Sequence, residues 1–217
     1  MKTEIQSIAV IGADSLGRGI AQAFLRAGYA TILEDRSRSR LEAAVAWIWG
    51  AIDEGKPGGK HLEVLPTGAQ QCCAPTMESC ADLLRATSVI EDAVRDADLI
   101  LEAAADELEV KLELFTLFDK FAKPGAILAS TSASLSIADM ASVTFCAERC
   151  IGLRFFDSGA IELVVTPETS AETIAACREV ARRMGREVVV VADGESAKEN
   201  DGESANKNDA VRRAAGV

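Results

Sequence analysis

The sequence predicts an α/β fold in which helices cover both faces of a doubly wound, mostly parallel sheet. Residues 8–11 are apolar at every position, as in a strand buried on both faces of a parallel sheet. After a short glycine turn an amphipathic helix pattern follows, with one apolar stripe at Ile20, Ala21, Phe24 and Leu25. Strand-like and helix-like runs then alternate along the chain, which is typical of this fold class.

The turn between the first strand and the first helix carries most of the glycine fingerprint G-x-G-x-x-G. Gly12 and Gly17 hold the first and third positions, which serve the tight turn and close helix packing. Asp14 holds the second, where glycine lets the backbone approach a pyrophosphate. Two hypotheses for Asp14 stay open: its carboxylate repels the pyrophosphate, or it caps the helix. The residues expected along a cofactor here are Gly12, Ala13, Asp14, Ser15, Leu16 and Gly17.

A second strand is expected at residues 31–34, and Asp35 stands at its carboxyl end, 18 residues after Gly17. An acid at this place hydrogen-bonds the adenosine ribose of NAD and disfavours NADP. Because strand, turn, helix and acid follow in the right order, the segment predicts a Rossmann-type unit with NAD as its cofactor.

The remaining elements follow from periodicity and turn residues. Helices are expected at residues 41–52, around 77–84, at 108–121 and at 137–141. Strands are expected at residues 98–103, 125–130, 151–155, 162–165 and 187–191. Residues 55–75 are irregular and predict a surface excursion. The capping box of residues 169–172 is expected to open a helix that ends near Gly185.

Composition excludes several classes of protein. The 217 residues, 48% of them hydrophobic, suffice for one full core. A net charge of −11 argues against binding to nucleic acid or anionic membranes. No apolar run is long enough to span a membrane, and residues 1–6 are too polar for a signal peptide, so a cytoplasmic location is expected.

We expect a nucleotide-binding domain over residues 1–192 and a polar tail over 193–217, in which DGESAKEN is nearly repeated as DGESANKN. The six cysteines form no C-x-x-C pair, which is typical of reduced thiols in a cytosolic protein. Cys72, Cys73 and Cys80 with His61 match no zinc spacing, so no metal is expected.

Several segments together are similar to a known family. They are IAVIGADSLGRGIAQAFLRAGY, ADLILEAAADELEVKLELF, FDKFAKPGAILAS and IGLRFF. Over residues 5–193 the chain resembles the NAD-binding domain of the 3-hydroxyacyl-CoA dehydrogenase family. The resemblance implies oxidation of the 3-hydroxyl of an acyl-CoA by hydride transfer to NAD; relatives act on carnitine, gulonate and diketones.

Family members also carry an all-helical domain that forms the dimer and closes over the substrate, and this chain stops before it. The resemblance therefore implies an acyl-CoA-like or small hydroxy or keto substrate. It also implies a homodimer or a complex with a partner that supplies the helical domain.

The same resemblance places substituted residues at the family's catalytic positions. The family's histidine run H-F-F-N-P reads RFFDS here, so Arg154 holds the histidine position. The family's N-T-S-S run reads TSAS, which places Ala133 at the catalytic serine. Glu162 matches the carboxylate that orients the histidine. A guanidinium stays protonated, so Arg154 is not expected to act as the base.

Three cofactor positions are also implied by the resemblance. Asp106 stands where the family has a glutamate near the nicotinamide ribose, Lys111 matches a lysine that reaches the cofactor, and Asp157 replaces the asparagine of H-F-F-N-P. Three functions stay open: a working NAD-dependent oxidoreductase, completed by a helical domain on another chain; a pseudoenzyme that keeps the fold and some dinucleotide affinity; and a reductase in which Arg154 polarises a carbonyl.

Overall fold

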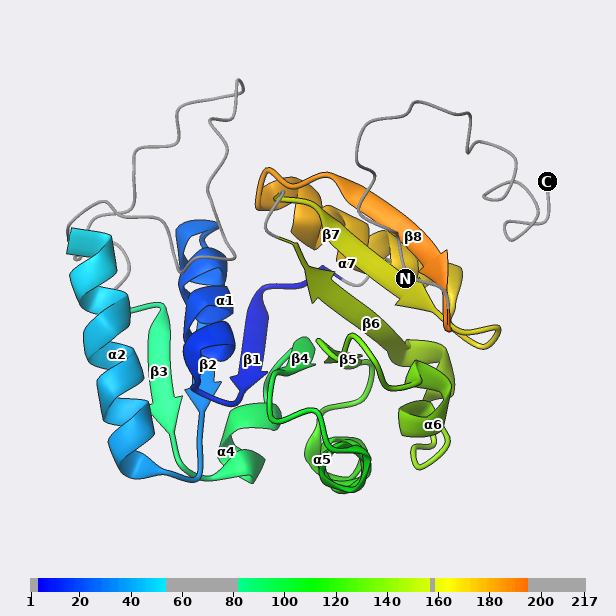
Figure 1. Ribbon diagram of the computed structural model, residues 1–217, viewed down its shortest axis with the longest axis horizontal. Helices are drawn as coiled ribbons and strands as arrows, with labels where there is room; N and C mark the ends of the chain where they lie inside the picture. Colours follow the sequence, from blue (N-terminus) through cyan, green and yellow to red (C-terminus); the bar gives the residue numbers. More distant parts are fainter. Residues whose placement is uncertain (1–3, 54–81, 157–158, 195–217) are drawn as a thin grey trace.

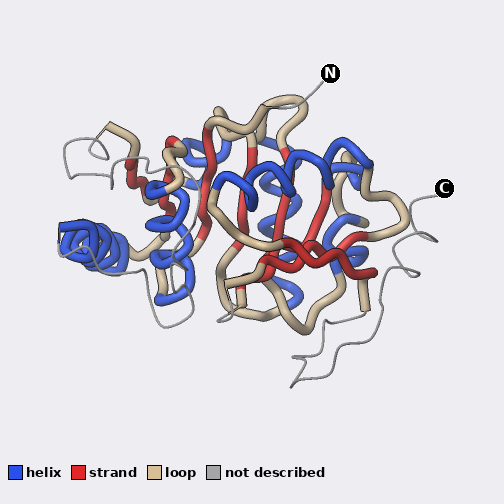
Figure 2. The backbone as a smooth tube through the Cα atoms, turned by 90° about the horizontal axis from the view of Figure 1, so that it is seen from above, coloured by secondary structure: helices blue, strands red, loops and turns tan. Residues whose placement is uncertain are grey.

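The computed structural model describes residues 4–53, 82–156 and 159–194, which form one sheet with helices on both sides (Figures 1 and 2). The strands are β1 Ser7–Ile11, β2 Ala30–Glu34, β3 Leu84–Thr87, β4 Leu99–Glu102, β5 Ile127–Ser130, β6 Cys150–Phe155, β7 Ile161–Val165 and β8 Val188–Ala192. The helices are α1 Ser15–Arg26, α2 Arg38–Asp53, α4 Ile90–Val94, α5 Leu108–Phe121, α6 Ile137–Ala141 and α7 Ala171–Arg183, with a 3-10 turn η1 at Ala147–Arg149.

The sheet has the strand order β3-β2-β1-β4-β5-β6-β7-β8. Every neighbouring pair is parallel except β6 and β7, which are antiparallel. The chain builds outward from β1 to β3 and then returns to β4 to build the other way, so the strand order reverses between β1 and β4. The Rossmann-type, doubly wound and mostly parallel sheet predicted from the sequence is confirmed.

Two hydrophobic cores lie on the two faces of this sheet. Ile8 and Val10 of β1 pack with α1, α2 and α7 on one face, while Ala9 and Ile11 pack with α4, α5 and α6 on the other. Successive side chains of a strand point to opposite faces, which is why an uninterrupted apolar run is needed here. Phe24 and Phe115, each fully buried, anchor the two cores.

Most predicted elements are present, and α5 and α6 begin and end at the predicted residues. The helix predicted around residues 77–84 is wrong at its end, because residues 82–83 form a turn and Leu84 begins β3. β3 is a four-residue, half-exposed edge strand whose sequence, LRAT, has little apolar periodicity to reveal it. Helix α4 was not predicted, and residues 54–81, including the irregular segment 55–75 and the four residues weighed as zinc ligands, lie outside the described residues.

The predicted capping box is displaced by one residue. Ser170, not Thr169, is the N-cap of α7, and its hydroxyl accepts a hydrogen bond from the Thr173 backbone N–H at 3.2 Å. The Thr169 hydroxyl instead donates to the Cys150 carbonyl at 2.9 Å. Thr169 fits the capping box better, because Glu172 follows it by three residues, but both hydroxyl residues are good N-caps and the contact of Thr169 with β6 leaves this role to Ser170.

The fold continues slightly beyond the predicted domain boundary. Asp193 Oδ2 accepts hydrogen bonds from the Ser136 hydroxyl at 2.7 Å and from the Ala138 N–H at 2.9 Å, which ties the end of β8 to the start of α6. Residues 195–217 lie outside the described part. Within the described part, Cys146, Cys150 and Cys177 are buried free thiols, no helix is long and apolar enough to cross a membrane, and no group of three or more acidic, histidine or cysteine side chains is arranged to hold a metal.

Candidate functional site

The predicted cofactor residues of the described part lie at the carboxyl ends of β1, β2 and β4 and on α5, whereas Arg154 and Glu162 lie on β6 and β7 (Figure 1). The turn after β1, the end of β2 and the loops after β4 and β5 all meet at the carboxyl edge of the sheet, around the border between β1 and β4. Ligands of open α/β sheets bind at this topological switch point because the connections from neighbouring strands diverge to opposite faces and leave a crevice.

The two fingerprint glycines are required by backbone geometry. Gly12 has a φ of +108°, and a Cβ at this position would lie 2.8 Å from the Ala103 carbonyl oxygen. A Cβ on Gly17 would lie 1.8 Å from the Gly12 carbonyl oxygen. A side chain at either position would push the start of α1 away from β1 and β4, so the predicted roles of both glycines fit the structure.

Asp14 is the N-cap of α1. Its φ of −73° and ψ of −166° are ordinary for any residue, and its Oδ1 accepts hydrogen bonds from the N–H groups of Leu16 and Gly17, both at 3.0 Å. The capping hypothesis is therefore confirmed. The same carboxylate engages N–H groups at the helix N-terminus, where backbone donors bind a pyrophosphate in this fold. Interference of Asp14 with a pyrophosphate stays a prediction.

Asp35 links the glycine turn to the end of β2. Only 6% of the residue is exposed, and its Oδ2 accepts a hydrogen bond from the Ala13 N–H at 3.0 Å, while Oδ1 accepts one from the Ser37 N–H at 2.8 Å. Arg40 Nη1 lies 3.2 Å from the same Oδ2. Asp35 thus stands at the place of the ribose acid. The residues present fit the ribose of a dinucleotide, and a pyrophosphate would meet the Asp14 carboxylate.

Lys111 lies beneath the loop that follows β4. It is 1% exposed, and its Nζ is 2.6 Å from Glu102 Oε2 and 3.3 Å from the Ala104 carbonyl oxygen. The Ser130 hydroxyl donates to the same Glu102 oxygen at 2.6 Å. This buried ion pair joins β4, α5 and β5. The sequence analysis does not predict Glu102 and Ser130 as site residues. A signal was present for Glu102, since it ends the apolar run DLILE, and a charge in a buried strand needs a partner because an unpaired charge is costly to bury.

Asp106 organises the loop after β5. Its Oδ1 accepts from the Ser132 hydroxyl at 2.5 Å and its Oδ2 from the Ser134 hydroxyl at 2.6 Å, and Lys111 Nζ lies 3.7 Å away. Burial raises the pKa of Asp106, but these two hydroxyls and the ammonium of Lys111 outweigh it and hold that pKa below its usual range. Asp106 is therefore a carboxylate at neutral pH.

Arg154 and Glu162 stand opposite each other in the antiparallel β6–β7 pair. Arg154 Nη1 lies 3.0 Å from Glu162 Oε2, and the exposed fractions of the two side chains are 9% and 0%. Arg154 Nε donates to the Ser132 carbonyl at 2.6 Å. Its remaining nitrogen, Nη2, donates to no residue within the described ranges.

Ala133 and Arg154 both line a cavity of about 260 Å³. The other lining residues are Ser134, Leu135, Ser136, Asp193 and Gly194. The structure thus brings together the two substituted positions, with Glu162 behind Arg154, while Asp157 lies outside the described residues. Asp193 was assigned to the tail from the sequence, and no local pattern predicts that it lies beside this cavity.

Comparison with known proteins supports this arrangement. Residues 7–194 match the family model described as "3-hydroxyacyl-CoA dehydrogenase, NAD binding domain". Among curated proteins, the chain is 31% identical over 196 residues to the mitochondrial hydroxyacyl-coenzyme A dehydrogenase of Sus scrofa, covering 88% of this chain and 60% of that protein. It is 29% identical to the probable 3-hydroxybutyryl-CoA dehydrogenase of Bacillus subtilis, covering 88% and 63%.

Solved structures of this family have the same fold. The crystal structure of FadB2 from Mycobacterium tuberculosis superposes with a TM-score of 0.73 at 28% identity, covering 88% of this chain and 65% of that one. The 3-hydroxybutyryl-CoA dehydrogenase of Escherichia coli gives a TM-score of 0.73 at 28% identity, covering 87% and 38%. The chain thus spans about three fifths of the length of the curated relatives that it matches. By sequence and structure alike, it belongs to the family of NAD-binding domains of the 3-hydroxyacyl-CoA dehydrogenases.

Proposed function

We propose that this chain is an NAD(H)-binding domain that has lost the family's base-catalysed oxidation of an alcohol. The observation that carries the proposal is the buried ion pair between Arg154 and Glu162, at 3.0 Å. It stands where the resemblance places a histidine and its orienting carboxylate. NAD, when bound, supplies the hydride acceptor, but the hydroxyl proton must still pass to a base of the protein.

Neither Arg154 nor Glu162 takes over the role of that base. The Arg154 guanidinium remains protonated at every physiological pH. Glu162 is fully buried behind it, and its Oε2 already accepts from Arg154 Nη1. Arg154 Nη1 and Glu162 Oε2 are therefore held in an ion pair. To a substrate hydroxyl in the cavity, Arg154 offers a donor where a histidine would offer an acceptor.

The second substitution removes a hydrogen bond to the substrate oxygen. Ala133 has no hydroxyl, and its neighbours do not replace one, because Ser132 and Ser134 both donate to Asp106. General base catalysis is typically worth about 10²–10⁴-fold in rate. Loss of the base alone is therefore expected to lower the rate of alcohol oxidation by about this factor.

A second candidate is a carbonyl reductase, and one observation favours it: Arg154 lines the cavity and its Nη2 makes no bond to any described residue. An arginine donates well to a carbonyl oxygen. In such a reaction the carbonyl carbon gains the hydride, the C=O π bond breaks, and the oxygen takes a proton from water. Arg154 would hold and polarise the oxygen without giving up its own proton.

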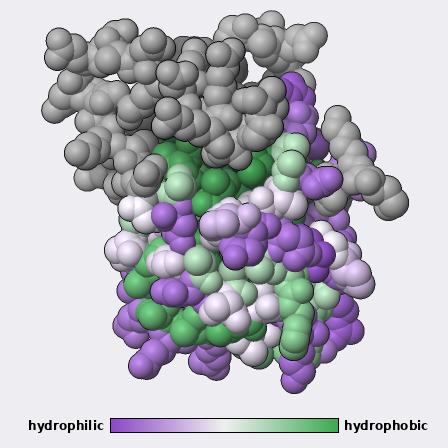
Figure 3. Space-filling model, turned by 90° about the vertical axis from the view of Figure 1, so that its right-hand side faces the viewer, coloured by the Kyte–Doolittle hydropathy of each residue, from purple (hydrophilic) through white to green (hydrophobic). Residues whose placement is uncertain are grey.

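The substrate and partner proposals follow from the family. We propose an acyl-CoA-like or small keto ligand for the cavity, and a homodimer or a helical-domain partner for the outer surface. Phe145 is fully exposed just beyond α6, and Val143 and Val189 are also exposed. Hydrophobic residues show among polar ones on the side of the molecule that Figure 3 presents. Light scattering of the purified chain tests association, and a monodisperse monomer at high concentration contradicts it.

The proposed function is tested with the purified full chain in two measurements. In a titration of NADH with the protein, the fluorescence of NADH is expected to change and to reach saturation, which reports binding. With 3-hydroxybutyryl-CoA and NAD, production of NADH is expected to stay undetectable, while turnover of about 1 s⁻¹ or more, the lower end of ordinary enzymes, overturns the loss of base catalysis. Consumption of NADH with acetoacetyl-CoA, under the same conditions, selects the reductase candidate.

A further inference from the structure

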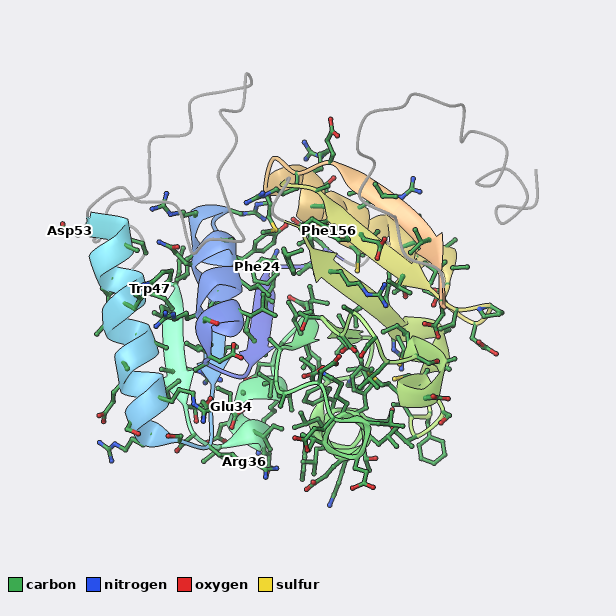
Figure 4. The ribbon with its side chains drawn as sticks, in the orientation of Figure 1. Phe24, Glu34, Arg36, Trp47, Asp53 and Phe156 are labelled. Carbon is green, nitrogen blue, oxygen red and sulfur yellow. The ribbon has the colours of Figure 1, made fainter. Side chains whose placement is uncertain are left out.

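The segment that follows β2 is unusually basic for an acidic chain. Residues 34–40 read EDRSRSR, which places three arginines and two serines directly after the ribose acid Asp35 in a protein of net charge −11. Figure 4 shows Glu34 and Arg36 together at the end of β2, where the adenosine half of a dinucleotide would lie. The inference below rests on the proposed dinucleotide binding and concerns which dinucleotide the site accepts.

Arg40 neutralises the residue that normally excludes NADP. An isolated acid at the end of β2 accepts hydrogen bonds from ribose hydroxyls and repels a 2′-phosphate. Here Arg40 Nη1 lies 3.2 Å from Asp35 Oδ2, and 57% of the Arg40 side chain is exposed. Its guanidinium has further N–H groups, and the exposure leaves them accessible to an anion. Asp35 and Arg40 therefore present both a ribose acceptor and a phosphate donor.

Two hydroxyls lie in the same cluster. The Ser37 N–H is fixed by Asp35 Oδ1, and the Ser37 and Ser39 hydroxyl oxygens lie 3.2 Å apart. The backbone N–H of Arg40 donates a hydrogen bond to Ser37 Oγ at 3.4 Å. The short segment is thus folded onto Asp35, with two hydroxyls, which are good donors to phosphate oxygens, beside Arg40.

The other two arginines differ in how firmly they are held. Arg36 Nη2 is 3.8 Å from Glu113 Oε1, and both side chains are mostly exposed, so this contact is weak and easily exchanged for a ligand. Arg38 Nε instead lies 2.9 Å from Glu42 Oε1, one turn along α2. The groups that would face a phosphate are therefore Arg40 and Arg36, with Asp35 and Glu113 opposing them.

The charge balance also depends on Glu34, which precedes Asp35. Glu34 is 3% exposed, and burial together with the neighbouring Asp35 charge raises the pKa of Glu34 to about 7. Near neutral pH this carboxyl is charged only part of the time, so it opposes an anion less than an exposed glutamate would. We infer that Arg40, Arg36, Ser37 and Ser39 form a subsite for the 2′-phosphate of NADP(H), and that the domain accepts NADP(H) as well as NAD(H).

The test compares ligands that differ in this one phosphate. Isothermal titration of the full chain with adenosine, 2′-AMP and 3′-AMP is expected to show 2′-AMP binding at least tenfold more tightly than the other two. NADPH is expected to bind within about threefold of NADH. Arg40→Gln is expected to weaken 2′-AMP and NADPH at least tenfold more than it weakens NADH. Its melting curve, recorded alongside, verifies that the variant is folded.

The matched control is Arg182→Gln, which removes the same charge from an exposed arginine of α7 that pairs with Glu179. If Arg40→Gln and Arg182→Gln weaken 2′-AMP equally, or if NADPH binds over a hundredfold more weakly than NADH, the subsite is overturned while NADH binding stands. If neither dinucleotide nor 2′-AMP binds, the subsite and the proposed function both fail. If 2′-AMP binds tightly and NADH does not, the subsite stands and the dinucleotide function fails.

Discussion

The two halves of the sheet retain different parts of the family's chemistry. In the half formed by β1 to β3, both glycines and Asp35 stand at their expected places, and the one departure, Asp14, is an unstrained helix cap. In the half formed by β5 to β8, the strands pair in regular register, and Arg154 and Ala133 stand where the resemblance places the reacting residues. In the first half, contacts with the main chain restrict which residues can replace the glycines. In the second half, the residue at position 154 has only to supply a partner for the buried charge of Glu162.

This difference explains how a catalytic position can change without loss of the fold. A Cβ at Gly17 would collide with the main chain, and no neighbour can adjust to it. Arg154, by contrast, donates hydrogen bonds to Glu162 at 3.0 Å and to the Ser132 carbonyl at 2.6 Å, so the buried carboxylate of Glu162 has a cation as its partner.

The largest effect is expected from a substitution that removes the ion pair between Arg154 and Glu162. Arg154→Leu leaves the fully buried Glu162 without its cation, and we expect a loss of about 3–5 kcal/mol in the free energy of unfolding, measured with urea. The double variant with Glu162→Leu is expected to recover most of this loss, since an apolar pair of similar volume is often neutral.

The control for this prediction is Arg182→Leu, whose pair with Glu179 is exposed and is expected to change the free energy of unfolding far less than Arg154→Leu does. A loss at Arg154 no greater than that at Arg182 would show that the β6–β7 pair does not hold a buried charge.

An intermediate effect is expected in the nucleotide half, at Glu34. The pKa of Glu34 is raised from 4.5 to about 7 by burial and by Asp35, so between these values the folded chain holds a proton that the unfolded chain has lost. Stability therefore falls as pH rises from about 4.5 to 7, by up to about 3 kcal/mol at 1.36 kcal/mol per unit. Glu34→Gln is expected to remove this loss.

The measurement is the difference in urea-unfolding free energy between Glu34→Gln and the unmodified chain, taken at several pH values. The difference is expected to grow in favour of the variant up to pH 7 and then to level off. A difference that is constant with pH contradicts the raised pKa.

The smallest expected effect separates the two consequences of Asp14. Asp14→Asn keeps a side-chain oxygen for the Leu16 and Gly17 N–H groups and removes only the charge. In a fluorescence titration, the dissociation constant of NADH is expected to be at least tenfold lower for this variant than for the unmodified chain, which corresponds to about 1.4 kcal/mol. The melting temperature is expected to stay unchanged. Asp14→Gly, which also frees the N–H groups, is expected to bind at least as tightly. Equal affinity in all three chains would leave Asp14 with capping alone.

Local patterns were sufficient for the long and strongly periodic elements. The sequence pattern of buried apolar residues within each element was enough to predict β1, α1 and the full extent of α5. β3 was missed because four half-exposed residues of an edge strand carry too little pattern, and α4 because five residues are too few to show a helical period. The N-cap of α7 was predicted one residue too early, because the Thr169 hydroxyl donates a hydrogen bond to the Cys150 carbonyl of β6.

The sequence by itself determined the fold class and the glycine turn, because these depend on spacing along one chain. The same spacing predicts Asp35 as the ribose acid, and the resemblance to the family predicts Arg154 and Ala133 as substituted catalytic positions. Only the tertiary structure decided how the charges pair. It placed Lys111 against Glu102, Arg154 against Glu162, and Arg40 against Asp35. Pairing is decided by which side chains the sheet brings within about 3 Å of each other in a region shielded from water, and no local pattern contains that distance.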